Sequence, residues 1–410
     1  MLKKTVLDNG VRILFDHLNH TESFCIGVFI RSGSKYENES NNGISHFIEH
    51  LLIRNNKGQT NFNEMGAVVN AFTTKEYTCF YLNTLSEFFH RSVNLFYDLI
   101  FDPFFNPDDI DKEKNVILNE INLYKDDPKE VCILNCVKTS LGGHPLAFEI
   151  LGPEENIQSF SVDLIEKYYK SFYVPEHSVV VVSGKISSQI EEEIVELFSK
   201  IPQGAEKKIK VVQPCFQGGT HFEERDTSQI HLCLQFETLG RSGPISDIFS
   251  LFIINFVLGG YRNSRLHRTI RKEHGLVYHI HSYPQIYEEI GLLNVYLNTT
   301  EHHFPLVQRM IKETLLTLRK SGITIPEFMV AKANFKSQTI FSMEKRLDRI
   351  FFFGQNELLK GFKYDIKDIH HILNTISIEQ VNNQLTQILT GPQSISIVSK
   401  RGKIPINLLV

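Results

Sequence analysis

The sequence predicts an α+β protein made of two similar halves, each with strands and long helices. Short runs of alternating apolar residues, which indicate strands, recur along the whole chain between longer apolar stretches with helical spacing. The order of these patterns in the first half is repeated in the second. The chain has 410 residues, which is more than one hydrophobic core normally holds. We therefore expect two domains.

A change of composition near the middle of the chain separates the two halves. Residues 201–219 contain two prolines, three glycines and a short run of charged residues. Such a composition is typical of an interdomain linker. We expect a first domain over residues 1–204, a linker over residues 205–219 and a second domain over residues 220–410.

The elements of the first half follow from apolar spacing and turn residues. The expected strands are residues 11–15, 25–31, 77–82 and 178–183. The expected helices are residues 61–69, 88–101, 108–126 and 186–200. A polar loop over residues 33–42 leads to one more helix, which we expect to begin near Asn42 or Gly43.

The second half repeats this order. The expected strands are residues 230–236, 276–284, 291–297 and 394–399, and the expected helices are residues 245–258, 265–274, 302–320 and 326–341. Residues 230–258 correspond in order to residues 25–53, which indicates a duplication. The second copy offers apolar residues where the first has histidines, so only the first half can hold a metal.

The first half is organised around residues 46–50, which read His-Phe-Ile-Glu-His. Residues three and four positions apart lie on one face of a helix, so His46, Glu49 and His50 share a face. Two imidazoles one turn apart can bind one Zn²⁺, and a carboxylate between them can reach a metal-bound water. This order is the reverse of the commoner His-Glu-x-x-His zinc-protease motif. The same spacing also occurs as a plain polar stripe on an amphipathic helix.

A third metal ligand must come from elsewhere in the chain, because a catalytic zinc usually has three protein ligands. Glu113 and Glu120 are seven residues apart and therefore share a face of the expected helix over residues 108–126. Leu118 and Ile121 flank Glu120, which favours a partly buried position. A lone glutamate on a helix is more often solvated, so both interpretations stay open at this point.

Composition and charge exclude several classes of protein. The formal net charge of -4 gives no basic surface for nucleic acid. No stretch approaches 18 unbroken apolar residues, so we expect no membrane span. The first residues lack the features of a signal or transit peptide, and we expect a cytoplasmic protein. Six cysteines spread through apolar contexts are typical of reduced, buried thiols rather than of a disulfide framework.

Together with several other segments, these residues resemble the M16 metallopeptidases, or inverzincins, in their shorter bacterial branch. This family includes pitrilysin, insulin-degrading enzyme and the mitochondrial processing peptidase. The similarity covers nearly the whole chain and is carried by residues 7–12, 33–34, 43–50, 70–73, 143–146 and 259–278. The resemblance implies two homologous α/β-sandwich halves, each a mostly antiparallel sheet packed with helices, that form a clam-shell around a central cavity.

The resemblance also implies the roles of the residues in the first half. His46, His50 and Glu120 match the family's zinc ligands, which bind one Zn²⁺ per chain, and Glu49 matches the general base. Glu113 matches an acid that supports the zinc ligands without binding the metal itself.

Further residues match the family's substrate-binding segments. Asn70 and Ala71 match a sheet edge that pairs with the substrate backbone. In the second half, Arg271 and Tyr278 match an Arg and Tyr pair seven residues apart that reaches the substrate carbonyl at the zinc.

The sequence departs from the family pattern in three places. Residues 51–56 read Leu-Leu-Ile-Arg-Asn-Asn, where the family usually has Met, Phe and Lys-Gly. The glycine run near Gly259 is broken by Tyr261 and Arg262, and the stretch between the histidines and Glu120 is a few residues short. None of these departures removes a ligand. They affect the expected substrate preference and the shape of the loops.

The resemblance implies a zinc-dependent endopeptidase that acts on short or unfolded peptides, either as a general oligopeptidase or as a maturation peptidase. It also implies a homodimer, or a heterodimer with an M16-like paralogue. A hypothesis of a different class is a catalytically silent M16-like partner or structural subunit. Silent relatives usually lose the histidines or the glutamate, whereas this chain retains all four residues of the expected centre.

Overall fold

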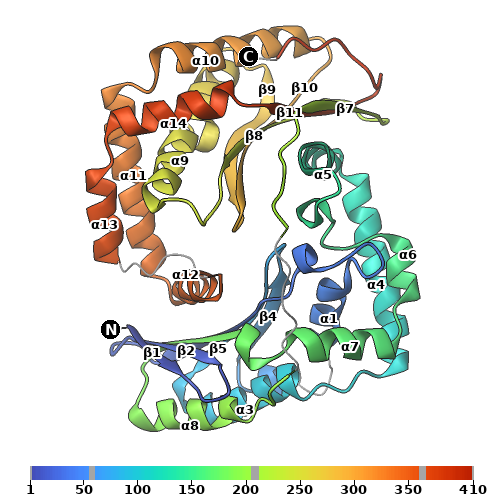
Figure 1. The fold of residues 1–410 in the computed structure, drawn as a ribbon, viewed down its shortest axis with the longest axis vertical. Helices are drawn as coiled ribbons and strands as arrows, with labels where there is room; N and C mark the ends of the chain where they lie inside the picture. The colour runs from blue at the N-terminus through green and yellow to red at the C-terminus, as the bar shows by residue number, and fades with distance from the viewer. Residues whose placement is uncertain (1, 55–60, 205–211, 360–365, 409–410) are drawn as a thin grey trace. The chain divides into compact units, whose positions relative to one another are not determined.

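The computed structural model describes residues 2–54, 61–204, 212–359 and 366–408 (Figure 1). The chain forms two compact units, and neither is a continuous stretch of the sequence. Unit 1 comprises Met1–Ile121, Phe148–Val211 and Phe341–Lys363. Unit 2 comprises Asn122–Ala147, Val212–Ile340 and Tyr364–Val410. Each unit therefore contains one segment that comes from the other half of the sequence.

Unit 1 is built on a six-stranded sheet with the strand order β1-β2-β6-β3-β5-β4. Its strands are β1 (Leu2–Val6), β2 (Arg12–His17), β3 (Ser23–Ile30), β4 (Val68–Thr73), β5 (Thr78–Leu85) and β6 (Ser178–Gly184). The pair β2–β6 is parallel and the other neighbours are antiparallel. The strands β1 and β4 form the two edges of the sheet, and β6 is buried along its whole length.

Helices cover both faces of this sheet. They are α1 (Ile44–Ile53), α3 (Phe89–Phe101), α4 (Pro107–Asp126), α6 (Glu154–Ser159), α7 (Val162–Phe172), α8 (Ser188–Ser199) and α12 (Arg346–Leu358), with short turns at η1 (Ser34–Tyr36), η2 (Ser86–Phe88) and η4 (Pro175–His177). Alternate strand residues point to opposite faces. Val180 and Val182 accordingly join the core on the side of α1, whereas Val179 and Val181 pack on the side of α12.

The helix α12 reaches unit 1 from the second half of the sequence and packs on β3 and β6. Its Arg349 forms an ion pair with Asp16 of β2, which is fully buried and also accepts a hydrogen bond from Ser183. At Gly354 the helix comes so close to the sheet that a Cβ there would lie 2.1 Å from the Phe29 ring. The buried ion pair and this close approach fix α12 on the sheet.

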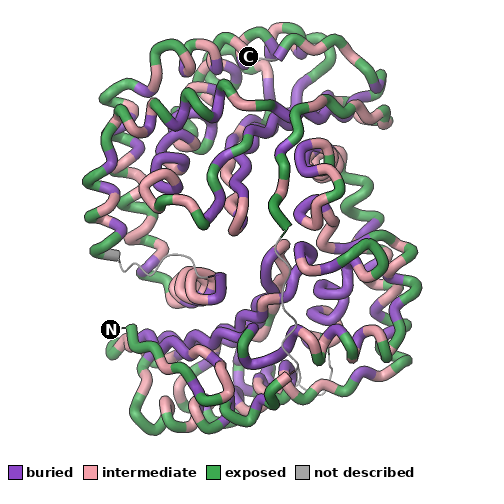
Figure 2. The backbone as a smooth tube through the Cα atoms, viewed as in Figure 1, coloured by how far each residue is buried: buried purple, intermediate pink, exposed green. Residues whose placement is uncertain are grey.

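Unit 2 is built on a five-stranded sheet with the order β7-β11-β8-β10-β9. Its strands are β7 (Gly219–Glu224), β8 (Ile230–Leu239), β9 (Val277–Ile286), β10 (Ile290–Thr299) and β11 (Gln393–Ser399). The pair β7–β11 is parallel and the others are antiparallel. As Figure 2 shows, the central strands of each sheet are mostly buried, whereas the helices alternate between buried and exposed residues.

The helices of unit 2 include one from the first half of the sequence. They are α5 (Pro128–Leu141), α9 (Ile245–Asn255), α10 (Phe304–Ser321), α11 (Ile325–Met343), α13 (Ile366–Thr375) and α14 (Ile378–Thr390), with the turns η3 (Pro145–Ala147), η5 (Phe256–Gly260) and η6 (His267–Lys272). The helix α5 packs on β8 and β11, where Cys132 and Cys136 lie in a small buried cluster. None of the described helices is long and apolar enough to cross a lipid bilayer.

Two sequence expectations are wrong. The expected helix over residues 61–69 ends at Glu64, the chain turns at Gly66 with a φ of 59°, and β4 begins at Val68. Pairing with β5 and a run of β-branched residues outweigh the helical spacing there. All six cysteines are free, but Cys215 is exposed because it lies in a segment without helix or strand. Residues 205–211 of the expected linker lie outside the described residues.

Candidate metal centre

The helix α1 begins where the local backbone allows only glycine. Gly43 has a φ of 102°, and a Cβ there would lie 2.6 Å from the carbonyl oxygen of Leu151. The buried carboxylate of Glu37 accepts hydrogen bonds from the N–H groups of Gly43 and Ser45, both at 2.8 Å. A carboxylate at this end of a helix is stabilised by the exposed N–H groups and the helix dipole. These contacts fix the start of α1 and thereby the place of the residues that follow.

Three polar side chains of α1 lie on one helical face, as the spacing predicts. His46 and Glu49 are buried, and the His50 side chain is 19% exposed. The neighbours Phe47 and Ile48 are fully buried in the core of unit 1 and hold the helix on the sheet. The helix therefore presents a polar face from a position fixed by packing.

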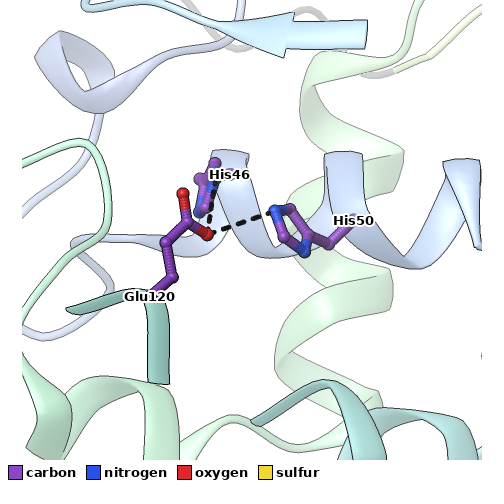
Figure 3. Close-up of side chains that lie close together, drawn as sticks. All are labelled: His46, His50 and Glu120. Carbon is purple, nitrogen blue, oxygen red and sulfur yellow. Dashed lines mark ion pairs between the residues drawn. The ribbon is translucent and has the colours of Figure 1, made fainter. Parts of the chain in front are cut away.

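His46, His50 and Glu120 come together although Glu120 lies on another helix, α4 (Figure 3). The Oε2 atom of Glu120 lies 3.8 Å from His46 Nε2 and 3.6 Å from His50 Nε2. The three ligand atoms lie within 4.8 Å of one another, and within the described residues no other such group of histidine, cysteine or acidic side chains occurs. Ligand atoms of a tetrahedral zinc site are about 3.4 Å apart. Two imidazoles and one carboxylate at these separations fit a zinc ion.

A hydrogen bond at Nδ1, the ring nitrogen that does not face Glu120, orients His50. Its Nδ1–H donates to Oε1 of Glu113 at 2.6 Å, which leaves the lone pair of Nε2 directed toward Glu120. The other oxygen of Glu113 accepts a hydrogen bond from Arg54 at 3.0 Å. Glu113 itself is only 3% exposed. Glu113 is therefore a buried carboxylate in contact with one candidate ligand, and its supporting role stays a prediction.

The surroundings shift the pKa values of the two histidines in opposite directions. Burial, with the nearby charge of His50, lowers the pKa of His46 to about 3, so its imidazole is neutral and able to bind a metal. Burial also lowers the pKa of His50, but its hydrogen bond to Glu113 and the charges of Glu49, Glu113 and Glu120 outweigh burial and raise it. The group thus concentrates negative charge around two imidazoles, an arrangement that favours a divalent cation.

Glu49 is held by Thr73, a residue without a predicted role. The hydroxyl group of Thr73, on β4, donates a hydrogen bond to Oε2 of Glu49 at 2.7 Å. Burial raises the pKa of Glu49, and this hydrogen bond opposes the shift. The alternation of residues along a strand could have indicated that Ala71 and Thr73 share a face. It could not have indicated that this face meets α1.

Asn70 and Ala71 lie on β4, at an edge of the sheet. Among the described strands, only β5 pairs with β4. The side chain of Asn70 is turned back onto its own strand, where its Oδ1 accepts a hydrogen bond from the N–H of Ala71 at 2.8 Å. An edge of this kind can accept an extended peptide as a further strand.

Arg271 and Tyr278 belong to unit 2. Arg271 lies in η6, with its Nη1 3.4 Å from Nε2 of His267. Tyr278 lies on β9, an edge strand, and is 67% exposed. Their part in the site stays a prediction.

Comparisons with known proteins identify the family. The model of the insulinase family, peptidase family M16, matches residues 12–154, and the model of the peptidase M16 inactive domain matches residues 159–335. An uncharacterised zinc protease of Bacillus subtilis is 33% identical over 411 residues, which cover 99% of this chain and 100% of that protein. The chain therefore belongs to peptidase family M16, in its bacterial type.

Particular relatives and solved structures extend this result. An uncharacterised zinc protease of Mycobacterium leprae is 28% identical, over 94% of this chain and 89% of its own. A protease from Helicobacter pylori has the same fold, with a TM-score of 0.91 at 19% identity over 97% of this chain and 99% of that chain. The structure of a peptidase M16 inactive domain from Pseudomonas fluorescens gives a TM-score of 0.91 at 19% identity, over 99% of each chain.

The two family models separate the part of the chain that contains the candidate metal-binding residues from the part that does not. The insulinase model includes all three residues of the candidate metal-binding group. The inactive-domain model falls on the part of the sequence in which the described residues form no comparable group. That only the first half can hold the metal stays a prediction.

Proposed function

We propose that this protein is a zinc-dependent endopeptidase that hydrolyses short or unfolded peptides. The observation that carries the proposal is the convergence of His46, His50 and Glu120, with Glu49 on the same face of α1. A zinc ion held by these three residues would make a bound water more acidic and would polarise the scissile carbonyl. The uncharacterised zinc proteases to which the chain is similar support the same metal.

Glu49 acts as the general base in this proposal. Its carboxylate takes the proton from the attacking water and then delivers it to the leaving amine. A buried carboxylate whose pKa is raised suits both steps, because it accepts a proton more readily than an exposed one. Thr73 holds the carboxylate in one orientation through its hydrogen bond.

The peptide is proposed to bind as an additional strand along β4, beside Asn70 and Ala71. Recognition through the backbone makes few demands on sequence, which suits a general oligopeptidase. A maturation peptidase for one precursor would use the same edge with further side-chain contacts. Arg271 and Tyr278 are proposed, from their resemblance to the family's Arg and Tyr pair, to stabilise the oxyanion. A homodimer, or a heterodimer with an M16-like paralogue, is proposed on the same ground.

The decisive experiment combines zinc analysis with peptide cleavage. Wild type, His50→Ala and Glu49→Gln are reconstituted with zinc, analysed for metal and mixed with a quenched fluorescent peptide library. We expect about one zinc in wild type and in Glu49→Gln, none in His50→Ala, and cleavage by wild type alone. A wild type that binds zinc but cuts no peptide would favour a silent partner subunit. A wild type that binds no zinc would contradict the proposal.

A further inference from the structure

Basic side chains from α1 and its C-terminal end alternate with acidic side chains from α4. His46, His50 and Arg54 follow one another at intervals of four residues along one face of α1 and its C-cap, while Glu113 and Glu120 are seven residues apart on α4. Glu120 lies beside both histidines, at 3.8 and 3.6 Å. Glu113 lies between His50 and Arg54, at 2.6 and 3.0 Å. These five side chains form a row in the order His46, Glu120, His50, Glu113 and Arg54. The row contains the three proposed ligands and ends at Arg54.

Both oxygens of the Glu113 carboxylate are held by this row. His50 donates to Oε1 and Arg54 donates to Oε2. A carboxylate as deeply buried as that of Glu113 needs such partners, because burial without them is costly. Two donors at its two oxygens also fix the plane of the carboxylate. The direction in which Glu113 faces His50 thus depends on Arg54.

The two histidines differ in how they are oriented. Nδ1 of His46 is buried and has no hydrogen-bond partner within the described part of the chain, so no hydrogen bond at that nitrogen sets the ring. The ring of His50 is set by Glu113. A change at Glu113 therefore acts directly on His50, and on His46 only through the contact between the two rings.

We propose that Arg54 is a positioning residue for the metal, which acts through Glu113 on His50 and so sets the affinity for zinc. The inference rests on the proposed function, since it concerns the same site. The planar guanidinium suits this role because its donors have a fixed direction. The backbone N–H of Arg54 also donates a hydrogen bond to the carbonyl oxygen of His50. This bond at the end of α1 holds Arg54 close to the proposed ligand His50.

Loss of the Arg54 charge should change metal binding much more than folding. The Arg54 side chain is 51% exposed, and Glu113 keeps its hydrogen bond from His50 when the arginine is lost. A matched control exists in unit 1. Arg91 is 55% exposed and pairs with Glu64 at 3.2 Å, but it has no part in the row. Arg91→Met removes an arginine of similar exposure from an ion pair with an exposed acid, Glu64.

The test measures zinc affinity by competition with a chromogenic chelator, for metal-free wild type, Arg54→Met, Arg54→Lys and Arg91→Met. We expect the Kd of Arg54→Met to rise about tenfold, as when a group behind a metal ligand is lost. Arg54→Lys should recover part of the loss, and Arg91→Met should match wild type. The absorption spectrum of bound Co²⁺ should change in Arg54→Met, because the geometry at His50 changes. Thermal unfolding of the metal-free proteins checks that they are folded.

Either of two results would overturn the inference alone: wild-type zinc affinity in Arg54→Met, or an equal loss in Arg91→Met. If Arg54→Met does not fold, Arg54→Gln replaces it, and wild-type affinity in that variant would be equally decisive. A wild type without zinc affinity would overturn both the inference and the proposed function. Zinc binding by wild type therefore separates failure of the inference from failure of the function.

Discussion

At the scale of single residues, one hydrogen bond links the proposed base to the strand proposed to bind the peptide. Thr73 lies on β4, and its hydroxyl group contacts Glu49 on α1. The same hydroxyl lies 3.2 Å from that of Thr78 on β5, which donates in turn to the carbonyl oxygen of Ser32. The base is thus fixed by the edge of the sheet as well as by its own helix.

Removal of the Thr73 hydroxyl should slow catalysis without loss of metal. Hydrogen bonds to charged groups contribute about 1.5–3 kcal/mol, so Thr73→Val should lower kcat roughly ten- to a hundredfold. KM should change little and the zinc content should stay at the wild-type level. Thr73→Ser keeps the hydroxyl group and should retain most of the activity. Steady-state kinetics on one cleaved peptide measures all three proteins, and equal losses in the two variants would contradict the role.

The sequence identified the candidate ligands at this scale, but not the residues that hold them in place. The spacing of His46, Glu49 and His50 within one turn of a helix is visible in the sequence itself. The contacts of Arg54 and Thr73 arise only when α4 and β4 lie against α1. Such contacts join distant parts of the chain, and no local spacing encodes them.

At the scale of elements, the start of α11 shows how charge fixes a helix end in unit 2. Glu327, in the first turn, accepts hydrogen bonds from the N–H and hydroxyl groups of Thr324, at 2.9 and 2.8 Å. Its two oxygens also accept from Arg265, at 2.8 and 2.7 Å. The Arg265 hydrogen bonds are the largest cause that lowers the pKa of Glu327 to about 2. The helix end is therefore stabilised by a carboxylate that stays ionised in acid.

The stabilising effect of Glu327 should disappear at low pH. Its pKa is lower in the folded than in the unfolded protein, so its contribution is complete above about pH 4.5 and is lost as the pH falls toward 2. At pH 7, Glu327→Gln should lower the free energy of unfolding by about 1 kcal/mol, since the pair is partly exposed to solvent. At pH 3 the difference from wild type should be clearly smaller.

Urea denaturation followed by circular dichroism at both pH values measures this effect. Glu313→Gln, at an exposed position of α10, controls for the loss of one negative charge. A difference between wild type and Glu327→Gln that stays constant from pH 7 to pH 3 would contradict the role of the ion pair.

Most of the strands and helices that the sequence predicts are present in the structure. Their apolar spacing, as in β3, β6, α3 and α4, is strong and local. The prediction failed at residues 61–69, where β4 exists because β5 pairs with it. This wrong prediction affects the proposed site, because β4 carries both the proposed peptide-binding edge and Thr73. A strand that depends on its partner is less visible in sequence than a helix with its own pattern.

At the scale of the whole molecule, the place of α12 in unit 1 depends on one glycine. A Cβ at Gly354 would lie 2.1 Å from Cε2 of Phe29, whose ring is fully buried. Displacement of a buried ring costs about 1–3 kcal/mol, so Gly354→Ala should destabilise the protein by that amount. At Gly391, with a φ of -72°, a Cβ would make only ordinary contacts from 3.5 Å outward, so Gly391→Ala should be close to neutral.

The free energy of unfolding of both alanine variants can be measured by chemical denaturation. Equal stability of Gly354→Ala and wild type would show that α12 does not pack as closely on β3 as described. The control variant shows whether alanine at a glycine position is itself harmful.

The repeated order of patterns predicted two halves, but not the exchange of segments between them. A helix pattern shows which side of the helix is apolar and does not show which sheet that side covers. The helix α5 follows α4 directly in sequence yet packs on β8 and β11. The helix α12 lies among the second-half helices in sequence yet packs on β3 and β6. Partner choice of this kind depends on the complete set of surfaces.

The position of α12 in the sequence has a consequence for how the protein is made. A ribosome releases β1 to β6 long before it reaches Phe341–Lys363, the segment that completes unit 1. At about 5–20 residues per second, the apolar side of that sheet would be without its helix for on the order of ten seconds or more. During this interval the exposed apolar face of the nascent chain would be a binding surface for chaperones. A ribosome that stalls in the second half would leave an incomplete, aggregation-prone product.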